Sequence, residues 1–271
     1  MAKTKADDQV GVNRTLYIPL YGKALVSRKG LLLRDPKAEE IWDREGFPLG
    51  GKAASKWLAY YMGMRAGVFD QWTARRLGED EAAVVLHIGC GMDARALRVE
   101  HPGHRWYDVD FPQVIRERRR YFTENGDYQL LSGDAREESW LEAIPERESA
   151  VVVLEGLSMY LTPEELETLL RRLRNHFAKL WILMDCYTEL AARLSRFGNP
   201  IRAVGVTQVY GLDRPESLER AGVTYVKAHS MTPEEAIAQL PRKEQGIFRK
   251  LYAGRMSKKL YRIYEYRAEN L

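Results

Sequence analysis

The stretch HIGCGMDAR, residues 87–95, decides the fold of this chain. It joins an apolar run at 83–88 (AVVLHI), which predicts a buried strand, to a segment that predicts a helix. A strand that runs through Gly-x-Gly into a helix is typical of open α/β sheets, in which glycine lets the backbone approach a ligand closely. Gly89 and Gly91 are therefore candidate ligand-binding residues, although many such turns carry glycine for turn geometry alone.

The residues that follow repeat the alternation of strand and helix. Further apolar runs predict strands at 105–110 (RWYDVD), 128–131, 150–154 and 180–184. Helical patterns fill the gaps, at 112–124, 137–144 and 163–178. Strands that alternate with helices predict a parallel sheet with helices on both faces, which is the doubly wound α/β class.

The remaining segments are expected to surround this core at 83–186 within one domain, 16–271. Residues 1–15 are predicted to be a flexible arm. Residues 16–78 predict a helical cap, in which Asp35 and Pro36 begin one helix. Residues 187–222 break the alternation and predict an insertion that acts as a substrate lid. Within 223–271, the segments 223–228 and 259–266 predict a closing antiparallel hairpin.

The composition excludes several classes of protein. Of the 271 residues, 45% are hydrophobic, which is enough for one sizeable core. With 42 Lys and Arg against 38 Asp and Glu, the formal charge of +4 is weak support for nucleic-acid binding. The densest basic cluster is predicted to be the solvated face of a helix, and it comprises Arg116, Arg118, Arg119 and Arg120. We therefore expect no nucleic-acid partner.

Cysteine spacing and hydropathy narrow the choice further. Cys90 and Cys186 are far apart and lack the spacing of a zinc site or a disulfide framework, so each is expected to be a small buried residue. No metal-ligand set is predicted. The N-terminal residues are polar, and no apolar run is long enough to span a bilayer. We expect a cytoplasmic protein without a membrane partner, and the sequence does not indicate its oligomeric state.

Acidic residues at the predicted strand ends indicate which ligand the crevice takes. Asp110 follows Gly91 by nineteen residues, close to the spacing of an acid that binds ribose hydroxyls. A dinucleotide site would need a third glycine near Ala94 and a helix N-terminus free of acids, where this chain has Asp93. An acid there disfavours a phosphate and suits a ligand with a sulfonium and an amine. The pattern therefore favours S-adenosylmethionine over NAD.

Two further strand ends carry groups that fit this ligand. Asp134 and Ala135, just past the third strand, offer a carboxylate and a backbone amide to an adenine. Glu155, at the end of the fourth strand, is placed to accept a hydrogen bond from the methionyl amine. Each residue alone is better explained as a helix cap or a turn residue. Groups of this kind at four successive strand ends favour the cofactor site.

The chain resembles the leucine carboxyl methyltransferase family, which includes bacterial polyketide carboxyl O-methyltransferases. Asp-x-Asp-Phe-Pro and Glu-Gly-x-x-x-Tyr-Leu are more diagnostic than Gly-x-Gly, and no firm match extends beyond about residue 187. The matching segments, in the family's order, are LYGKALVSRKGLLLRDPKAEEIW (20–42), MRAGVFD (64–70), HIGCGMDAR (87–95), YDVDFPQVIRERRR (107–120), SGDARE (132–137) and EGLSMYLTPEEL (155–166).

The resemblance implies a mostly parallel, seven-stranded, Rossmann-like methyltransferase sheet with N-terminal helices and an insertion after strand five. It also implies roles for individual residues: Arg65 for the cofactor's carboxylate, Gly89 for the motif loop, Asp110 for the ribose, Asp134 and Ala135 for the adenine, and Glu155 for the amine. Lys23 falls near a position where the family often has a basic residue at the active site, and it is carried over as a cofactor-site residue.

At three positions the resemblance does not assign a single role. Tyr160 is a candidate wall of the acceptor pocket, or equally a core aromatic residue. His87 stands where the family usually has an aliphatic residue, and Asp108 stands where it commonly has Glu. The His87 change is expected to reflect packing, and both departures leave the acceptor open.

The methyl transfer implied by the family requires no general base from the protein. A carboxylate is ionised at neutral pH, because its ordinary pKa is near ~4, and it attacks a sulfonium methyl group without a general base. We therefore predict no catalytic residue, and we expect the acceptor to be a small-molecule or peptide carboxylate. The alternatives are an acceptor hydroxyl, amine or modified nucleoside, with a base supplied by 187–222. A non-catalytic cofactor-binding protein and a nicotinamide-dependent reductase are further alternatives.

Overall fold

The computed structural model describes residues 16–46, 49, 51–145, 149–195 and 208–269. The predicted arm at 1–15 and part of the predicted lid, 196–207, lie outside the described residues. Seven strands form one sheet in the order β3-β2-β1-β4-β5-β7-β6. The strands are β1 (Val84–Ile88), β2 (Trp106–Asp110), β3 (Tyr128–Ser132), β4 (Ser149–Leu154), β5 (Lys179–Tyr187), β6 (Thr224–His229) and β7 (Tyr261–Glu269).

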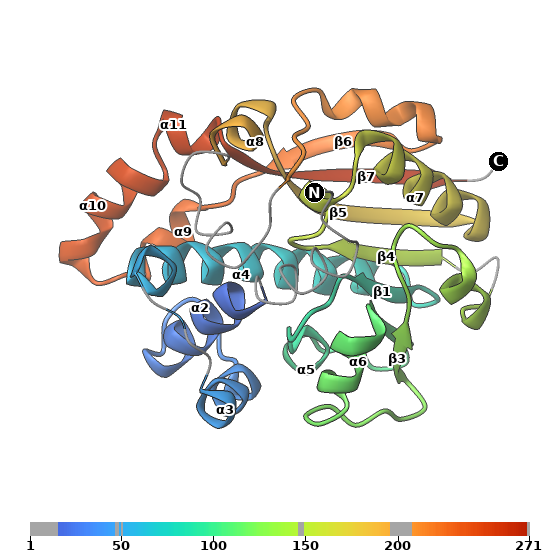
Figure 1. Ribbon diagram of the computed structural model, residues 1–271, viewed down its shortest axis with the longest axis horizontal. Coiled ribbons are helices and arrows are strands. Elements are labelled where there is room, and N and C mark those ends of the chain that lie inside the picture. The colour runs from blue at the N-terminus through green and yellow to red at the C-terminus, as the bar shows by residue number, and fades with distance from the viewer. Residues whose placement is uncertain (1–15, 47–48, 50, 146–148, 196–207, 270–271) are drawn as a thin grey trace, which may run out of the picture.

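The pairing of the strands confirms the doubly wound α/β class. β1 to β5 are parallel, whereas β7 pairs antiparallel with both β5 and β6. The order reverses direction between β1 and β4, and their carboxyl ends flank the crevice in which ligands of such sheets bind. The predicted antiparallel pairing of the last two strands is thus confirmed, as an edge on a parallel sheet (Figure 1). The two strands do not form a hairpin, because helices lie between them in the chain.

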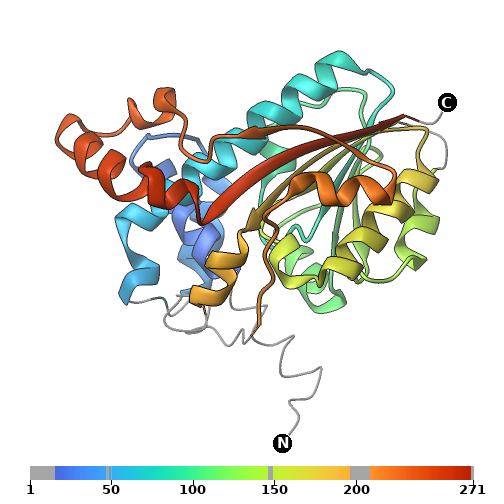
Figure 2. The same cartoon turned by 90° about the horizontal axis from the view of Figure 1, so that it is seen from above.

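Helices cover both faces of the sheet, with α4 on one face and α7 on the other (Figure 2). The α-helices are α2 (Tyr17–Arg28), α3 (Pro36–Glu45), α4 (Lys56–Glu79), α5 (Arg95–Arg98), α6 (Pro112–Arg118), α7 (Pro163–His176), α8 (Glu189–Ser195), α9 (Glu234–Ile237), α10 (Arg242–Tyr252) and α11 (Arg255–Lys258). Short 3-10 turns are η1 (Gly51–Ala54), η2 (Ser139–Ala143), η3 (Ser158–Tyr160) and η5 (Pro215–Ala221).

Local sequence signals explain where the helices begin. Asp35 accepts a hydrogen bond from the backbone N–H of Ala38 at 2.9 Å, with Pro36 in the first turn of α3. Thr162 and Glu165 form the reciprocal capping box of α7. Each capping interaction satisfies backbone donors that the start of a helix leaves free. The starts of these two helices could therefore be predicted from the sequence.

Two predicted helices are shorter than expected. α6 ends at Arg118 instead of 124, because the carbonyl of Arg118 accepts from both Tyr121 and Phe122 and tightens the chain into a turn. The segment expected to be helical at 137–144 is only the 3-10 turn η2. There, the indole of Trp140 is tied back to the carbonyl of Asp134 at 3.1 Å.

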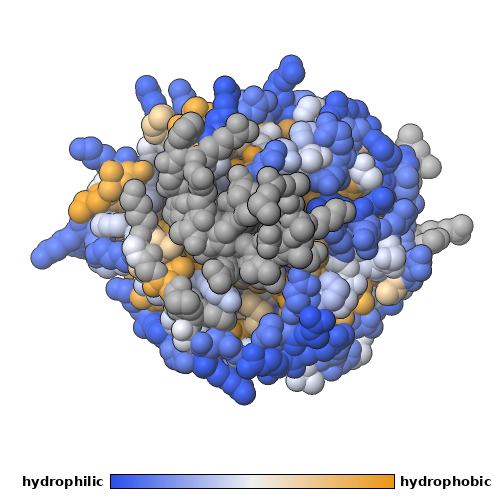
Figure 3. Space-filling model, viewed as in Figure 1, coloured by the Kyte–Doolittle hydropathy of each residue, from blue (hydrophilic) through white to orange (hydrophobic). Residues whose placement is uncertain are grey.

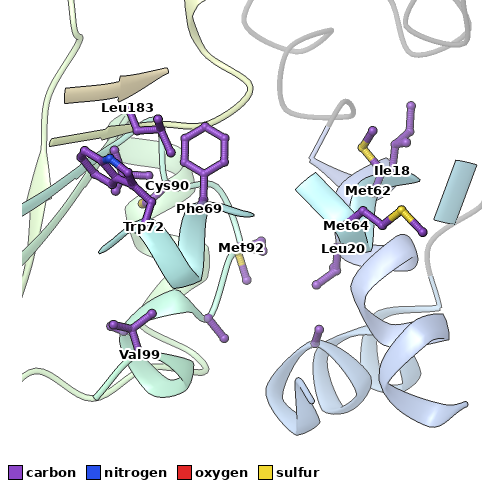
Figure 4. Packing of buried hydrophobic residues seen from close by; sticks show 14 of the residues in the cluster. Ile18, Leu20, Met62, Met64, Phe69, Trp72, Cys90, Met92, Val99 and Leu183 are labelled. Carbon is purple, nitrogen blue, oxygen red and sulfur yellow. The ribbon is translucent and has the colours of Figure 1, made fainter. Parts of the chain in front are cut away.

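The core lies in two layers, one on each face of the sheet. On one face, Ile18 and Leu20 of α2 lie beside Met62 and Met64 of α4 (Figure 4). On the other, leucines of α7 pack on β4 and β5. On the face seen in Figure 3, the described residues at the surface are mainly hydrophilic. The two layers fix α2 and α4 over the carboxyl end of β1, where the candidate site lies.

Candidate active site

A cavity of about 210 Å³ lies at the carboxyl ends of β1 and β4, between these strands and the helices α2 and α4. Its polar wall includes Lys23, Arg65, Asp93 and Glu155. Its other wall is mainly apolar and aromatic, with side chains from α2, from the first turns of α4 and from the ends of β5 and β7. The cavity therefore offers a charged end and an apolar end.

The turn after β1 forms the floor of the charged end. Gly89 and Gly91 have φ of +71° and +53°, a region that favours glycine. A Cβ at Gly91 would lie only 2.8 Å from the Leu16 side chain, which precedes α2. Glycine is thus needed both for the turn and for the close approach of the N-terminal helix.

Asp110 supports this turn from the end of β2. Its carboxylate accepts hydrogen bonds from the backbone N–H groups of Gly91 and Phe111, each at 2.7 Å. Burial raises the pKa of Asp110 to about 6, although both hydrogen bonds oppose that rise. The acid at the predicted ribose position therefore lies directly behind the turn.

Arg118 corrects the expectation that the basic run is a solvated face. Arg116, Arg119 and Arg120 are exposed, but Arg118 is fully buried. Its Nη1 donates to the carbonyls of Gly91 and Asp93 at 2.8 and 2.9 Å. The position faces inward on α6, and the Asp108 carboxylate balances the charge there. Arg118 therefore holds the same turn that Asp110 supports.

The two departures from the family pattern are neighbours. His87 and Asp108 are register partners on β1 and β2, and His87 Nδ1 lies 3.3 Å from Asp108 Oδ1. Burial, together with the nearby Arg95 guanidinium, lowers the pKa of His87, so the ring is neutral at physiological pH. Arg118 is the main charge partner that brings the pKa of Asp108 down to about 2. His87 was expected to be a packing residue, but it belongs to this polar cluster and lines the cavity.

Arg65 is the centre of the charged wall. It is buried in α4. Its Nη2 lies 2.9 Å from Glu155 Oε1, and its Nη1 lies 2.9 Å from Asp185 Oδ2. Nη1 also donates to the hydroxyl of Tyr261 at 2.8 Å. Arg65 is thus held by groups from three strands.

Glu155 is further restrained by Arg95, with which it forms a buried ion pair. Burial opposes ionisation, but the cations Arg65 and Arg95 outweigh it and lower the pKa of Glu155 to about 2. Glu155 therefore remains ionised at any physiological pH, as a residue that binds an amine requires.

Lys23 joins the N-terminal helix to the motif turn. Its Nζ lies 3.0 Å from Asp93 Oδ1, and both side chains are buried. Arg98 and Arg95 also contact Asp93, and these cations hold the pKa of its carboxyl well below the usual range. The negative charge that argued against a phosphate is therefore compensated within the protein.

The structure brings most of the predicted site residues to one cavity. Those that line it are Lys23, Arg65, Gly89, Gly91, Glu155 and Tyr160. Asp110, which supports the motif turn from behind, lies outside this lining. Asp134 and Ala135 follow β3 and also lie outside it, and Asp134 pairs with Arg136 at 2.6 Å. Their assignment to the adenine stays a prediction.

The sequence reasoning missed Asp185 and Tyr261. Asp185 closes the apolar run of β5, so it carries the same signal, an acid at a strand end, that identified Asp110 and Glu155. Tyr261 begins β7 far along the chain, and no local pattern distinguishes it from the other tyrosines of that strand.

Cys90 and Cys186 are free and buried, and burial raises the pKa of both thiols, which makes them poor nucleophiles. Among the residues that the structure places, no group of three or more His, Cys, Asp or Glu side chains could hold a metal ion. None of the described helices is both long and apolar enough to cross a membrane.

Comparison with solved structures identifies the fold. A proposed methyltransferase from Thermobifida fusca YX has a TM-score of 0.57 at 15% identity, with 92% of this chain and 94% of that chain covered. Magnesium protoporphyrin IX methyltransferase from Synechocystis PCC 6803, with bound S-adenosylhomocysteine, has a TM-score of 0.51 at 10% identity. That match covers 86% of this chain and 93% of the other. At such identities the similarity establishes the Rossmann-like methyltransferase fold alone.

Sequence comparison identifies the family. The tetracenomycin polyketide synthesis O-methyltransferase TcmP of Streptomyces glaucescens is 34% identical over 211 residues, which span 77% of this chain and 78% of that protein. An S-adenosyl-L-methionine-dependent methyltransferase of Gibberella zeae, dpfgK, is 28% identical over 235 residues, with the same two coverages. The family model for leucine carboxyl methyltransferase matches residues 5–174. The chain therefore belongs to the leucine carboxyl methyltransferase family and is an S-adenosylmethionine-dependent methyltransferase.

Proposed function

We propose that this enzyme transfers a methyl group to a carboxylate oxygen and produces a methyl ester. The observation that carries the proposal is the state of the acids in the cavity. Asp93 and Glu155 are buried in ion pairs, and their pKa values lie well below the usual range, at about 2 for Glu155. Such carboxylates are too weakly basic to deprotonate a hydroxyl or phenol. The neutral ring of His87 also lines the cavity, but its nitrogens face Asp108 at 3.3 Å and Arg95 at 3.4 Å. A carboxylate acceptor needs no base.

The residues of the charged end fit S-adenosylmethionine. We infer that the ionised Glu155 accepts from the ligand's amine and that Arg65 contacts its carboxylate. Arg65 Nε supports this role, because it is buried without a hydrogen-bond partner among the described residues. Asp110 is assigned to the ribose, Asp134 and Ala135 to the adenine, and the Gly89–Gly91 turn to the close approach of the ligand. Lys23 is assigned to shaping this end through Asp93.

Catalysis in this account rests on binding and alignment. When bound, S-adenosylmethionine supplies a methyl group activated by a positive sulfur. The fixed carboxylates of the charged end favour that positive charge, and the apolar wall excludes water from the acceptor's oxygen. Orientation and desolvation of an ionised acceptor then supply the rate enhancement without a proton transfer.

The acceptor is assigned to the apolar end of the cavity. We assign Met159, Tyr160 and Tyr187, which line the cavity, to this end. We propose that the described part of 187–222 contributes its outer wall as a lid, because the N–H of Tyr210 donates to the carbonyl of Met159 at 2.9 Å. An acceptor with a sizeable apolar body and one carboxylate, whether a small molecule or a peptide, suits this wall. A cytoplasmic location is part of the same proposal.

The test uses acceptors that differ only at the reacting group. An apolar acid that is methylated should be compared with the primary alcohol and the primary amide on the same carbon skeleton, at saturating S-adenosylmethionine. The proposal predicts turnover of the acid alone. Equal or greater turnover of the alcohol would show that a base operates in the cavity and would overturn the carboxylate assignment.

A further inference from the structure

We propose that Asp185 and Tyr261 form a positioning pair, which fixes the Arg65 guanidinium so that one of its edges faces the amino-acid end of the cofactor. The inference rests on the proposed role of Arg65. It assigns a function to the ends of β5 and β7, which the family-diagnostic motifs do not include.

Asp185 connects three elements at the base of the cavity. It is completely buried near the end of β5. Its carboxylate accepts from Arg65 Nη1 at 2.9 Å, from the backbone N–H of Gly156 at 2.6 Å and from the hydroxyl of Tyr261. Its backbone carbonyl accepts from the hydroxyl of Ser158. One residue therefore ties α4, the turn after β4 and the start of β7 together.

Tyr261 completes the arrangement from the antiparallel edge of the sheet. Its hydroxyl donates to Asp185 Oδ2 and accepts from Arg65 Nη1 at 2.8 Å. Its ring is held edge-on by Tyr187, with 4.9 Å between ring centroids and 64° between planes. The hydroxyl is thus fixed in place on a strand that the cofactor motifs do not reach.

These contacts determine which part of the guanidinium remains available. Asp185 and Tyr261 both use Nη1, and Glu155 contacts Nη2. Nε is buried and has no hydrogen-bond partner among the residues the structure places. Because the guanidinium is planar, fixing Nη1 fixes the direction of the Nε–Nη2 edge. That edge is the two-pronged donor that a ligand carboxylate recognises.

The turn that follows Glu155 depends on the same residue. Gly156 has φ of +74°, and its N–H is held by Asp185. A Cβ at Gly156 would lie 3.7 Å from Arg65 Nη1, so the turn packs against the guanidinium. Asp185 therefore sets Arg65 and the backbone beside Glu155 in one fixed relation.

The test separates positioning of the amino-acid end from general support of the fold. It measures the affinity of purified full-length protein for S-adenosylhomocysteine and for 5′-methylthioadenosine, which has the same nucleoside but no amino-acid group. Tyr261→Phe and Asp185→Asn should weaken S-adenosylhomocysteine by about tenfold, the loss of one charge-assisted hydrogen bond, and leave 5′-methylthioadenosine within about twofold. Tyr264→Phe is the matched control, since Tyr264 lies on the same strand but in the core of the opposite face.

The ratio of the two affinities remains informative if a variant is less stable, because a smaller folded fraction weakens both ligands equally. Equal losses for both ligands, or no loss for either, would overturn the inference. Arg65→Ala separates this inference from the role of Arg65 on which it rests. If Arg65→Ala lowers the ratio of the S-adenosylhomocysteine affinity to the 5′-methylthioadenosine affinity but Tyr261→Phe and Asp185→Asn do not, only the positioning pair is refuted. If Arg65→Ala leaves this ratio unchanged, the role of Arg65 itself is refuted.

Discussion

The carboxylate of Asp110 lies 2.7 Å from the backbone nitrogen of Gly91, so the residue that ends β2 holds the turn that follows β1. The two residues are nineteen positions apart in the chain, and they lie at the carboxyl ends of two neighbouring parallel strands. The contact places an acid and a glycine turn on the same side of the crevice, as a site for a ribose requires.

Replacing Asp110 should weaken cofactor binding. Asp110→Ala removes an acceptor from both the turn and the ribose and should cost about 1.5–3 kcal/mol of binding free energy for S-adenosylhomocysteine. Titration calorimetry measures the loss. Asp127→Ala, an exposed acid before β3, is the control and should bind like the wild type. Wild-type affinity in Asp110→Ala would mean that the carboxylate serves the turn alone.

Binding should also depend on pH through Asp110. Its pKa of about 6 means that the carboxylate takes up a proton as the pH falls below 6, and the protonated form has lost the charge that favours two ribose hydroxyls. S-adenosylhomocysteine should therefore bind progressively more weakly between pH 7 and pH 5. Asp110→Asn should give a flatter profile over the same range, and identical profiles would contradict the assignment.

The raised pKa of Asp110 also makes the stability of the folded chain depend on pH. The pKa of Asp110 is higher in the folded chain than its ordinary value of 3.8, so the folded state binds the proton more tightly. The contribution of this group to stability is fully present below pH 3.8 and is lost as the pH rises through about 6. Relative to Asp110→Asn, wild-type protein without ligand should lose thermal stability between pH 4 and pH 7. If the difference in melting temperature between wild type and Asp110→Asn does not change with pH, the raised pKa of Asp110 is contradicted.

Arg118 is predicted to be essential for the fold although it lies in a basic run. Arg118→Met leaves Asp108 buried without its cation and releases the carbonyls of Gly91 and Asp93, so it should cost about 3–5 kcal/mol of unfolding free energy. Arg116→Met, on the exposed face of the same helix, should change stability by less than about 0.5 kcal/mol. Urea unfolding measures the free energy of unfolding of both variants. If Arg118→Met costs as little as Arg116→Met, the basic run is a solvated surface after all.

The contact between Leu16 and Gly91 predicts a rescue. Gly91→Ala places a Cβ 2.8 Å from the Leu16 side chain at a φ of +53°, so it should lower both stability and cofactor affinity. Adding Leu16→Ala removes the clash but not the backbone strain, which costs about 1–2 kcal/mol. The double variant should therefore recover part of the loss. Strictly additive losses would mean that the N-terminal helix does not press on the turn.

Short-range patterns explain why so much of the fold could be predicted. All seven strands were expected close to their observed positions. The five parallel strands could be predicted because buried parallel strands are largely apolar runs. The starts of α3 and α7 followed from Asp35 and Thr162, whose caps act within three residues. The end of α6 was missed, since a bifurcated turn at the Arg118 carbonyl leaves no compositional signal.

The site was predictable only where function and local sequence coincide. Gly91, Asp110 and Glu155 could be proposed as site residues because they lie at strand ends within recognisable motifs. Two other residues, Asp185 and Tyr261, were not proposed. Asp185 has the strand-end signal but lies outside the motifs, and the contacts of both with Arg65 span 120 and 196 residues of the chain. Arg118 was misassigned because a run of basic residues does not reveal which one faces Asp108 of β2. The packed structure settles which of these charges is paired and buried.

The most direct test of the account is the chemical stability of the methylated product. The enzyme is incubated with S-adenosylmethionine labelled in its methyl group and with an acceptor that it turns over, and the purified product is briefly treated with mild alkali. A methyl ester hydrolyses under these conditions, so the account predicts that the label is released as methanol and the acceptor is recovered as its free acid. Label that stays on the acceptor after this treatment would identify an ether or an N-methyl product and would contradict carboxyl transfer.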